Sequence, residues 1–370
     1  MRITGLAAYS SDLHYDGTAY AFAGGRSYQH FTSTVVVLTT DEGLTGFGEV
    51  CPCGPSYMPA FAGGLPACLE ELAPHVIGED PRHTSRLHRK MDRALNGHAY
   101  AKAAIDIACW DLLGKAAGLP VHVLLGGLLT ETMPLHRIVP LSDPAAMAAS
   151  LDAYRKAGFR HFQVKLGHDV DEDIAMMRCL ADGWQHGEVW VGDINGAWRR
   201  DQVARFSRSL QDLDLILEQP CASYEECLSF RQRAHHPIKL DECLTSVADV
   251  QRALKDDAMD AMALKVSKFG GLTPSRLIRD LCVAAGIPMT IEDAWGSGIA
   301  TAAYAHLAAS TPTPYLLNTT DLHRYNTTQL AHGAPEVTCG TMRLSNRPGL
   351  GAEPDFSLLS VPLVTAGSLN

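Results

Sequence analysis

The chain has 370 residues, of which 46% are hydrophobic and 19% are charged, and its formal net charge is −10. Such a composition is ordinary for a globular protein, and the length suits one large α/β barrel with a smaller companion domain. Because 41 acidic residues outnumber 31 basic ones, a nucleic acid or an anionic membrane is excluded as the main partner. Apolar residues alternate in Met1–Ser10, which is typical of a strand and not of a signal peptide. The ten cysteines of the chain form no CxxC pair, so we expect a cytoplasmic protein with reduced thiols.

Residues 1–128 are predicted to form an α+β domain. Phe31–Thr40 is rich in β-branched residues, Leu44–Val50 alternates, and Asp41-Glu42-Gly43 between them is typical of a β-hairpin turn. In Leu65–Gly118 apolar residues recur at intervals of three and four, which indicates helices. The chain therefore begins with strands and continues with helices.

From about Met133 short apolar strands alternate with amphipathic helices, which is typical of βα units and a parallel sheet. We expect eight strands, at Pro134–Pro140, His161–Leu166, Glu188–Asp193, Leu215–Glu218, Ile238–Asp241, Met262–Lys265, Pro288–Glu292 and Tyr315–Asn318. Eight such strands predict a closed parallel barrel over residues 129–332. We expect residues 333–370 to form a C-terminal segment that packs back on the first domain.

Ionisable side chains stand at the ends of six successive expected strands. They are Lys165, Asp193, Glu218, Asp241, Lys265 and the pair Glu292-Asp293. Neighbouring members are 23 to 28 residues apart, which is close to the length of one βα unit. Because the carboxyl ends of barrel strands converge over one mouth, we expect these side chains to share a site.

Three of these residues, Asp193, Glu218 and Asp241, are consecutive acids that would crowd negative charge in a partly buried mouth. Such crowding is unfavourable unless a cation is present. All-oxygen ligation without Cys or His at these strand ends favours one Mg²⁺ over Zn²⁺. Each acid alone could instead cap a helix or pair with an Arg, but three on successive strands favour a metal site.

Lys165 and Lys265 flank the acids along the chain, so we expect them to face each other across the metal. A lysine acts as a base only when its pKa falls below its reference value of about 10.4, and a dication, a second ammonium or burial can lower it. This pair predicts removal of the proton next to a substrate carboxylate. The alternative is a pair of solvated strand-end lysines, which is the interpretation we give to Lys239 and Lys268.

These residues resemble the enolase superfamily and, within it, the muconate-lactonising-enzyme subgroup. The resemblance covers nearly the whole chain and includes Ala101–Lys115, Leu125-Gly126-Gly127 and Leu264-Lys265 followed by Gly270-Gly271-Leu272. It implies an α/β fold, a modified TIM barrel of the (β/α)7β type with an N-terminal α+β capping domain. It also implies that the three acids bind Mg²⁺ and that the two lysines are the acid and base.

More narrowly, Asp106–Lys115, Met289–Gly296 and Asn318–Tyr325 are similar to the cis-3-hydroxy-L-proline dehydratases, with proline-betaine epimerases as near neighbours. The resemblance implies a small-molecule carboxylate substrate, a proline derivative, and a homo-oligomer. Two departures stand out. The usual Lys-x-Lys of the second strand reads Gln163-Val164-Lys165, and the usual Trp-Gly-Gly-Asp reads Trp295-Gly296-Ser297-Gly298.

Tyr57, Asp293 and Trp295 are our candidates for contact with the substrate. The leading hypothesis is a Mg²⁺-dependent dehydratase of cis-3-hydroxy-L-proline that gives Δ1-pyrroline-2-carboxylate. The alternatives are a racemase or epimerase of proline, proline betaine or another amino acid derivative, and a ligand-binding homologue without turnover. An acid-sugar dehydratase is disfavoured because no histidine is placed on the seventh strand.

Overall fold

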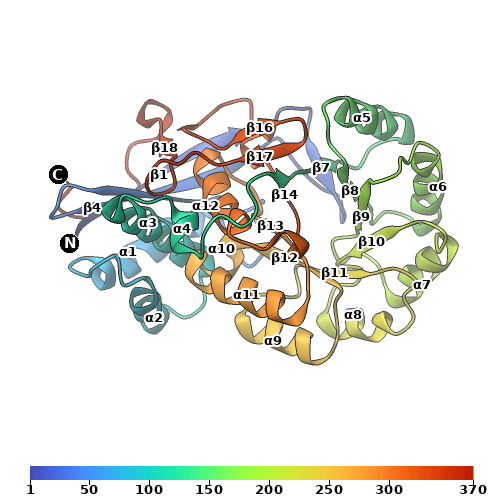
Figure 1. Cartoon of the computed structure of the whole chain (residues 1–370), viewed down its shortest axis with the longest axis horizontal. Coiled ribbons are helices and arrows are strands. Elements are labelled where there is room, and N and C mark those ends of the chain that lie inside the picture. Colours follow the sequence, from blue (N-terminus) through green and yellow to red (C-terminus); the bar gives the residue numbers. More distant parts are fainter. Residues whose placement is uncertain (370) are drawn as a thin grey trace.

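Eight parallel strands form the barrel of the computed structural model, which describes residues 1–369 (Figure 1). They are β7 (His136–Val139), β8 (His161–Lys165), β9 (Val189–Asp193), β10 (Leu215–Glu218), β11 (Ile238–Leu240), β12 (Ala261–Lys265), β13 (Met289–Glu292) and β14 (Leu316–Thr319). Each strand pairs with the next in chain order, and a parallel bridge between Leu135 and Thr319 joins the two ends of the sheet. The ring is therefore closed, as the alternation of strands and helices predicted.

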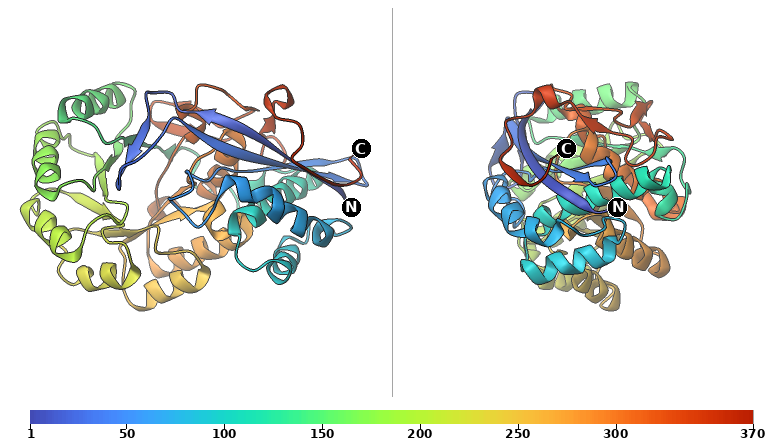
Figure 2. Two further views of the ribbon diagram at one scale, coloured as in Figure 1. Left: turned by 180° about the vertical axis from the view of Figure 1, so that it is seen from behind. Right: turned by 90° about the vertical axis from the view of Figure 1, so that its left-hand side faces the viewer.

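Seven helical connections join the eight strands and cover the outside of the barrel (Figures 1 and 2). The helices are α5 (Pro144–Lys156), α6 (Val170–Ala181), α7 (Arg200–Ser209), α8 (Tyr224–Arg231), α9 (Val247–Lys255), α10 (Val266–Phe269) with α11 (Leu272–Ala285), and α12 (Gly298–Ala309). This order confirms the (β/α)7β barrel. No helix within residues 1–369 is long and apolar enough to cross a membrane.

The strand expected over Pro134–Pro140 is divided in the structure. Its first part, β6 (Met133–Pro134), pairs with β17 (Thr341–Arg343), which in turn pairs with β16 (Glu336–Thr338). The N–H of Leu135 donates to the carbonyl of Gly340. The chain therefore enters the barrel only at β7, because the residues before it pair with the C-terminal segment.

The capping domain is a four-stranded sheet backed by helices. The sheet has the order β19 (Val364–Gly367), β1 (Ile3–His14), β4 (His30–Thr40), β5 (Thr45–Val50), and the antiparallel β4–β5 pair confirms the predicted hairpin. The helices are α1 (Leu65–Val76), α2 (Thr84–Ala94), α3 (Ala99–Ala117) and α4 (Val121–Leu124). Because β19 pairs with β1, both chain ends lie together at one end of the molecule (Figure 2).

Short elements complete the chain. The strands are β2 (Tyr20–Phe22), β3 (Arg26–Tyr28), β15 (Ala331–His332) and β18 (Glu353–Pro354), and the 3-10 helices are η1 (Ala62–Gly64), η2 (Thr313–Tyr315), η3 (Leu322–Tyr325) and η4 (Phe356–Leu358). All ten cysteines are free in the structure.

Helix α3 packs directly on β5, and two glycines make this approach possible. A Cβ atom built at Gly48 would lie 2.0 Å from the carbonyl oxygen of Ala104, and one at Gly46 would lie 2.5 Å from that of Ala108. Any larger residue would push the helix away from the sheet. These two glycines thus fix the position of α3.

Glu49, which directly follows Gly48 on β5, links the capping sheet to α12. Its buried carboxylate accepts hydrogen bonds from Ser297 N at 2.8 Å, Ser297 Oγ at 2.6 Å, Ala300 N at 2.8 Å and Ser33 Oγ at 2.7 Å. Ser297 is the N-cap of α12, so the negative charge lies where the helix dipole favours it. Glu49 therefore holds the N-terminal domain against the segment that follows β13.

Glu49→Gln is expected to lower the free energy of unfolding by about 2 kcal/mol, because one buried carboxylate oxygen becomes an amide group that cannot accept from these donors. Urea unfolding measured at one pH tests this. The control is Glu70→Gln at an exposed position of α1, which is expected to change stability little. Equal stabilities of the two variants would contradict the assigned role of Glu49.

Candidate active site

The strand ends bring the five predicted catalytic and metal-binding residues to one end of the barrel. Lys165 ends β8, Asp193 ends β9, Glu218 ends β10 and Lys265 ends β12, while Asp241 directly follows β11. In the sheet Lys165 lies opposite Asp193, and Asp193 lies opposite Glu218. All five side chains are buried, with at most 5% of the residue surface exposed.

A cavity between this end of the barrel and the capping domain contains both predicted catalytic lysines. Lys165 and Lys265 line it from the barrel side, and the aromatic rings of Tyr20, Phe22 and Tyr57 line it from the capping domain. The strands β8 and β12 are the second and sixth of the eight in the ring, so they stand on opposite sides of the barrel. The two ammonium groups therefore enter one space from opposite sides.

Each of these two lysines is paired with one of the predicted metal ligands. Lys165 Nζ donates to Asp193 Oδ2 at 2.5 Å, and Lys265 Nζ donates to Asp241 Oδ2. Burial opposes the charge on Lys165, but the carboxylate of Asp193 outweighs it and raises the lysine pKa; Lys265, paired with Asp241, behaves in the same way. The lowered lysine pKa that we expect for catalysis depends on a bound dication and stays a prediction.

Two further lysines belong to the same charge network. Lys239 Nζ donates to Glu218 Oε2 at 3.1 Å, and Lys268 Nζ donates to Asp241 Oδ1 at 2.8 Å. Only 1% of Lys239 and 3% of Lys268 is exposed. Our interpretation of both as solvated lysines is therefore wrong: they neutralise carboxylates that would otherwise be buried and unpaired.

The acid set has the chemistry of a site for a hard dication. Gln163 Nε2 donates to both Asp193 Oδ2 at 3.3 Å and Glu218 Oε2 at 2.7 Å, so one amide links the two carboxylates. Glu218 Oε1 is buried and has no hydrogen-bond partner. Burial raises the pKa of Glu218 to about 7, and the nearby charges of Asp193 and Asp241 also raise it. These carboxylate oxygens, one of them without a hydrogen-bond partner, are donors of the kind that fits Mg²⁺.

The same carboxylates are not yet arranged as a set of metal ligands. In the part of the chain that the structure describes, no three acidic, histidine or cysteine side chains stand at the mutual spacing of ligands. Lys165 and Lys265 contact the oxygens Asp193 Oδ2 and Asp241 Oδ2. A dication would have to replace these two ammonium groups.

Tyr57 reaches from the capping domain into this network. Its hydroxyl donates to Asp241 Oδ2 at 2.9 Å and accepts from Lys265 Nζ at 3.0 Å. The cavity beneath it measures only about 30 Å³, which is room for about one water molecule. A substrate of the size of proline therefore requires the Tyr57 loop or its neighbours to move.

The other two substrate-contact candidates lie in different places. Asp293 lines the cavity, but its carboxylate accepts from Ser267 N at 2.9 Å, Ala294 N at 2.7 Å and Ser267 Oγ. Trp295 is 1% exposed, packs on Phe31 with ring centroids 4.2 Å apart, and does not line the cavity. The structure does not support direct contact of Trp295 with a substrate, because other aromatic rings enclose its indole.

Position 298, where the similar proteins usually have an Asp, does not face the cavity. A Cβ atom at Gly298 would lie 2.7 Å from Ala334 Cβ and 3.2 Å from Ala331 Cβ. Here the preceding residue, Ser297, caps α12 and bonds to Glu49. The glycine is thus explained by close packing against the segment after β14.

Several residues near the lysines were not assigned a role from the sequence. Glu292 Oε1 lies 3.3 Å from Lys265 Nζ, and Glu292 Oε2 lies 3.6 Å from His136 Nε2. Glu242 Oε1 accepts from Asn195 Nδ2 at 2.8 Å. Closeness in the sequence to the predicted metal ligands identifies two of these residues, because Glu242 directly follows Asp241 and Asn195 lies two residues after Asp193.

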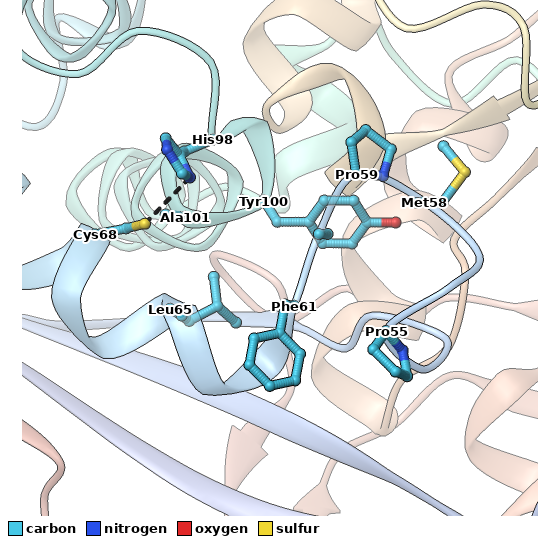
Figure 3. Close-up of a pocket in the computed structure, with 11 residues that line it drawn as sticks. Pro55, Met58, Pro59, Phe61, Leu65, Cys68, His98, Tyr100 and Ala101 are labelled. Atoms are coloured by element: carbon cyan, nitrogen blue, oxygen red, sulfur yellow. Dashed lines mark hydrogen bonds between the residues drawn. The ribbon is translucent and has the colours of Figure 1, made fainter.

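A second, larger cavity lies in the capping domain, with a volume of about 290 Å³ (Figure 3). Its walls include Met58, Phe61, Leu65 and Tyr100, and His98 at its edge contacts Cys68 Sγ at 3.3 Å. These walls are mostly apolar and contain none of the lysines or acids described above. The ionisable groups therefore point to the smaller cavity between the barrel and the capping domain as the candidate active site.

Two family models match the chain. The Mandelate racemase / muconate lactonizing enzyme, N-terminal domain, matches residues 23–126, and the Enolase C-terminal domain-like model matches residues 146–358. The chain is 44% identical to the cis-3-hydroxy-L-proline dehydratase of Roseibium aggregatum over 98% of this chain and 99% of the relative. It is also 28% identical to the N-succinyl-L-Arg/Lys racemase of Bacillus cereus over 95% of each chain.

Solved structures agree with this assignment. A mandelate racemase/muconate lactonizing enzyme from Roseovarius nubinhibens ISM superposes with a TM-score of 0.96 at 43% identity, over 100% of this chain and 99% of that one. A second structure from the same organism, complexed with magnesium, gives 0.96 at 37% identity over 99% and 100%. The chain belongs to the enolase superfamily and is an enzyme of its mandelate racemase/muconate lactonizing group.

Lys239→Met is expected to lower the free energy of unfolding by about 3 kcal/mol above pH 7, because it leaves the Glu218 carboxylate buried without its ammonium partner. Below a pH of about 7 Glu218 takes up a proton and becomes neutral, so the loss should shrink as the pH falls. Denaturant unfolding at pH 6 and pH 8 tests whether the loss of stability is smaller at the lower pH. Lys255→Met, at an exposed position of α9, is the control and should show no such pH dependence. A loss that grows toward low pH would contradict the pairing.

Proposed function

We propose that this enzyme dehydrates cis-3-hydroxy-L-proline to Δ1-pyrroline-2-carboxylate in a Mg²⁺-dependent reaction. The observation that carries the proposal is the placement of Lys165 and Lys265 on opposite sides of one cavity. The similarity to a dehydratase of that substrate over the whole chain supports the choice of substrate.

The stereochemistry of the substrate matches two lysines on opposite sides. In cis-3-hydroxy-L-proline the carboxylate and the hydroxyl share one face of the ring, so the hydrogen on C2 and the hydroxyl on C3 lie on opposite faces. One lysine, as the amine, removes the C2 proton, and the other, as ammonium, protonates the departing hydroxyl. The resulting enamine then tautomerises to the cyclic imine without further help from the protein.

The residues at the strand ends have separate tasks in this scheme. Asp193, Glu218 and Asp241 would hold the metal, and Gln163 would orient two of them through its amide. A dication bound there supplies positive charge that lowers the pKa of both lysines and stabilises the negative charge developing on the substrate carboxylate. The aromatic side chains of the capping domain exclude water from the closed cavity.

Racemisation or epimerisation is the second candidate. The same two lysines could remove and return an α-hydrogen from opposite faces of a substrate that lacks the 3-hydroxyl group. The similarity to a racemase over nearly the whole chain favours this alternative. A ligand-binding protein without turnover would show neither reaction.

Incubation with cis-3-hydroxy-L-proline in D₂O, followed by proton NMR, tests the proposal. We expect loss of the C2 proton signal together with formation of the cyclic imine. Exchange of the α-hydrogen in proline derivatives without loss of water would instead indicate an isomerase, and no exchange with any of these substrates would indicate a binding protein.

Replacing Lys165 or Lys265 by Ala is expected to reduce kcat by at least about 10³-fold, because each lysine has its own proton-transfer step. Circular dichroism should show that both variants fold. The matched control is Lys156→Ala, on the outer helix α5, which should keep full activity. Activity retained in both cavity variants would refute the two-lysine mechanism.

Removal of metal by a chelator is expected to abolish turnover, and Mg²⁺ is expected to restore it. Gln163→Leu should weaken Mg²⁺ binding by about 10- to 100-fold, because the amide no longer holds Asp193 and Glu218. Isothermal titration with Mg²⁺ measures this without a substrate. Gln185→Leu, at an exposed position before β9, is the control, and equal affinities of the two variants would contradict the role of Gln163.

A further inference from the structure

Glu292 is a buried carboxylate at the edge of the cavity to which the proposed metal site gives no task. It ends β13, lines the cavity and is 4% exposed. In the parallel sheet it lies opposite Lys265, which ends β12, and its Oε1 lies 3.3 Å from Lys265 Nζ. Lys265 also pairs with Asp241, which follows β11 on the other side of β12. The Lys265 ammonium group therefore stands between two carboxylates.

The two lysines of the cavity differ in their second partner. Each contacts one carboxylate of the proposed metal site. Beyond that contact, Lys165 Nζ has the uncharged side-chain oxygen of Asn195 at 3.5 Å, whereas Lys265 Nζ has the carboxylate of Glu292. A carboxylate stabilises a buried ammonium group more than an amide oxygen does. Lys265 thus keeps an anionic partner in reserve.

The second oxygen of Glu292 faces His136, the first residue of β7. Glu292 Oε2 lies 3.6 Å from His136 Nε2, which is longer than a hydrogen bond, and this nitrogen is buried without a hydrogen-bond partner. The other ring nitrogen, Nδ1, contacts Asn318 Oδ1 at 3.1 Å. Burial lowers the pKa of His136 to about 4, so its imidazole is neutral near pH 7. His136 therefore does not compete with Lys265 for the Glu292 carboxylate.

Asp241 cannot offer the same oxygen fully to Lys265 and to a metal. Its Oδ2 accepts from Lys265 Nζ and from the hydroxyl of Tyr57 at 2.9 Å, and its Oδ1 accepts from Lys268 Nζ at 2.8 Å. Metal binding at Oδ2 would release the Lys265 ammonium group into a closed cavity, where a charge without a partner is unfavourable. The carboxylate of Glu292, already 3.3 Å away, can receive it.

We propose that Glu292 is the positioning residue of Lys265 and holds its ammonium group at the edge of the cavity once Asp241 binds the metal. This role rests on the proposed function, because it takes Asp241 as a metal ligand. A small rotation of the Lys265 side chain is enough, since both carboxylates already lie around the same nitrogen. Glu292 thereby fixes the side of the cavity from which Lys265 reaches the α-carbon of a substrate.

A crystal structure of the enzyme with Mg²⁺ and without substrate tests the position of Lys265. We expect its Nζ to lie about 3 Å from a carboxylate oxygen of Glu292 and outside hydrogen-bond distance of Asp241. A Lys265 side chain that stays on Asp241 beside the metal, or that turns away from Glu292, would overturn the proposal. A metal bound away from Asp241 would overturn the proposed metal site and this role with it.

Glu292→Gln removes the charge and keeps the size of the side chain. The two enantiomers of proline present their α-hydrogens to opposite lysines, so their exchange in D₂O, followed by proton NMR at saturating Mg²⁺, measures each lysine separately. We expect this variant to slow exchange of one enantiomer by about 10²-fold, the same one that Lys265→Ala affects, and the other by less than about twofold. Equal slowing of both enantiomers would overturn the proposal, because a general effect on the metal would reach both lysines. Glu336→Gln, at an exposed position of β16, is the control and should change neither rate.

These measurements separate the role of Glu292 from the proposed reaction. Selective slowing of one proline enantiomer, without dehydration of cis-3-hydroxy-L-proline by the unmodified enzyme, would count against the proposed reaction and support the role of Glu292. If neither enantiomer exchanges, the structure of the Mg²⁺ complex decides. If Glu292→Gln fails to fold, Glu292→Asp replaces it in the same comparison, because it keeps the charge but shortens the side chain, and we then expect a difference between the enantiomers of about 10-fold.

Discussion

Charge neutralisation inside the end of the barrel is the constraint on which the rest of the structure depends. Buried carboxylates are tolerated only when cations or hydrogen-bond donors contact them. Asp193 is matched by Lys165, Glu218 by Lys239, and Asp241 by two ammonium groups. Because the partners sit on neighbouring strands, the parallel register is what brings each pair together. A barrel with a shifted register would leave several of these charges buried and unpaired.

The wall opposite the strand ends comes from the capping domain, and buried carboxylates also hold this domain in place. Asp106 on α3 accepts from the backbone N–H of Thr273 at 2.9 Å and from its hydroxyl at 2.5 Å. Asp111 accepts from Phe47 N at 3.0 Å and Leu350 N at 2.8 Å, so one side chain joins the helix to β5 and to the C-terminal segment. Together with Glu49, these contacts keep Tyr57 over the lysines.

The grouping of the candidate site residues could be predicted from the sequence because barrel geometry repeats. One ionisable residue at each strand end, about one βα unit apart, defines a common mouth whatever the side chains between them do. The alternation of side chains along each strand, with a period of two, predicts further residues of the site. Gln163 is two residues before Lys165, and Lys239 is two before Asp241, so each shares the inward face of its strand. Their burial follows from that alternation.

Other features depended on contacts between distant segments. Trp295 directly follows a residue that lines the cavity. Its indole is nevertheless enclosed by Phe31 and Tyr20, which are far away in the sequence. The division of the first barrel strand depends on pairing with residues more than 200 positions later. The lysine pKa values follow from which carboxylate oxygen each ammonium contacts, and no spacing rule gives that information.

In the proposed mechanism, the opposed lysines allow one scaffold to serve either a dehydratase or a racemase. Removing the α-proton is the shared step, and its outcome depends on whether the substrate carries a leaving group that the second lysine can protonate. The lysines cannot select between such substrates, since they would act on either. Selection would therefore come from the shape of the cavity, one wall of which is the aromatic surface of Tyr20, Phe22 and Tyr57 from the capping domain. In the proposed mechanism the barrel supplies the two lysines, and the capping domain supplies the aromatic wall against which a substrate would fit.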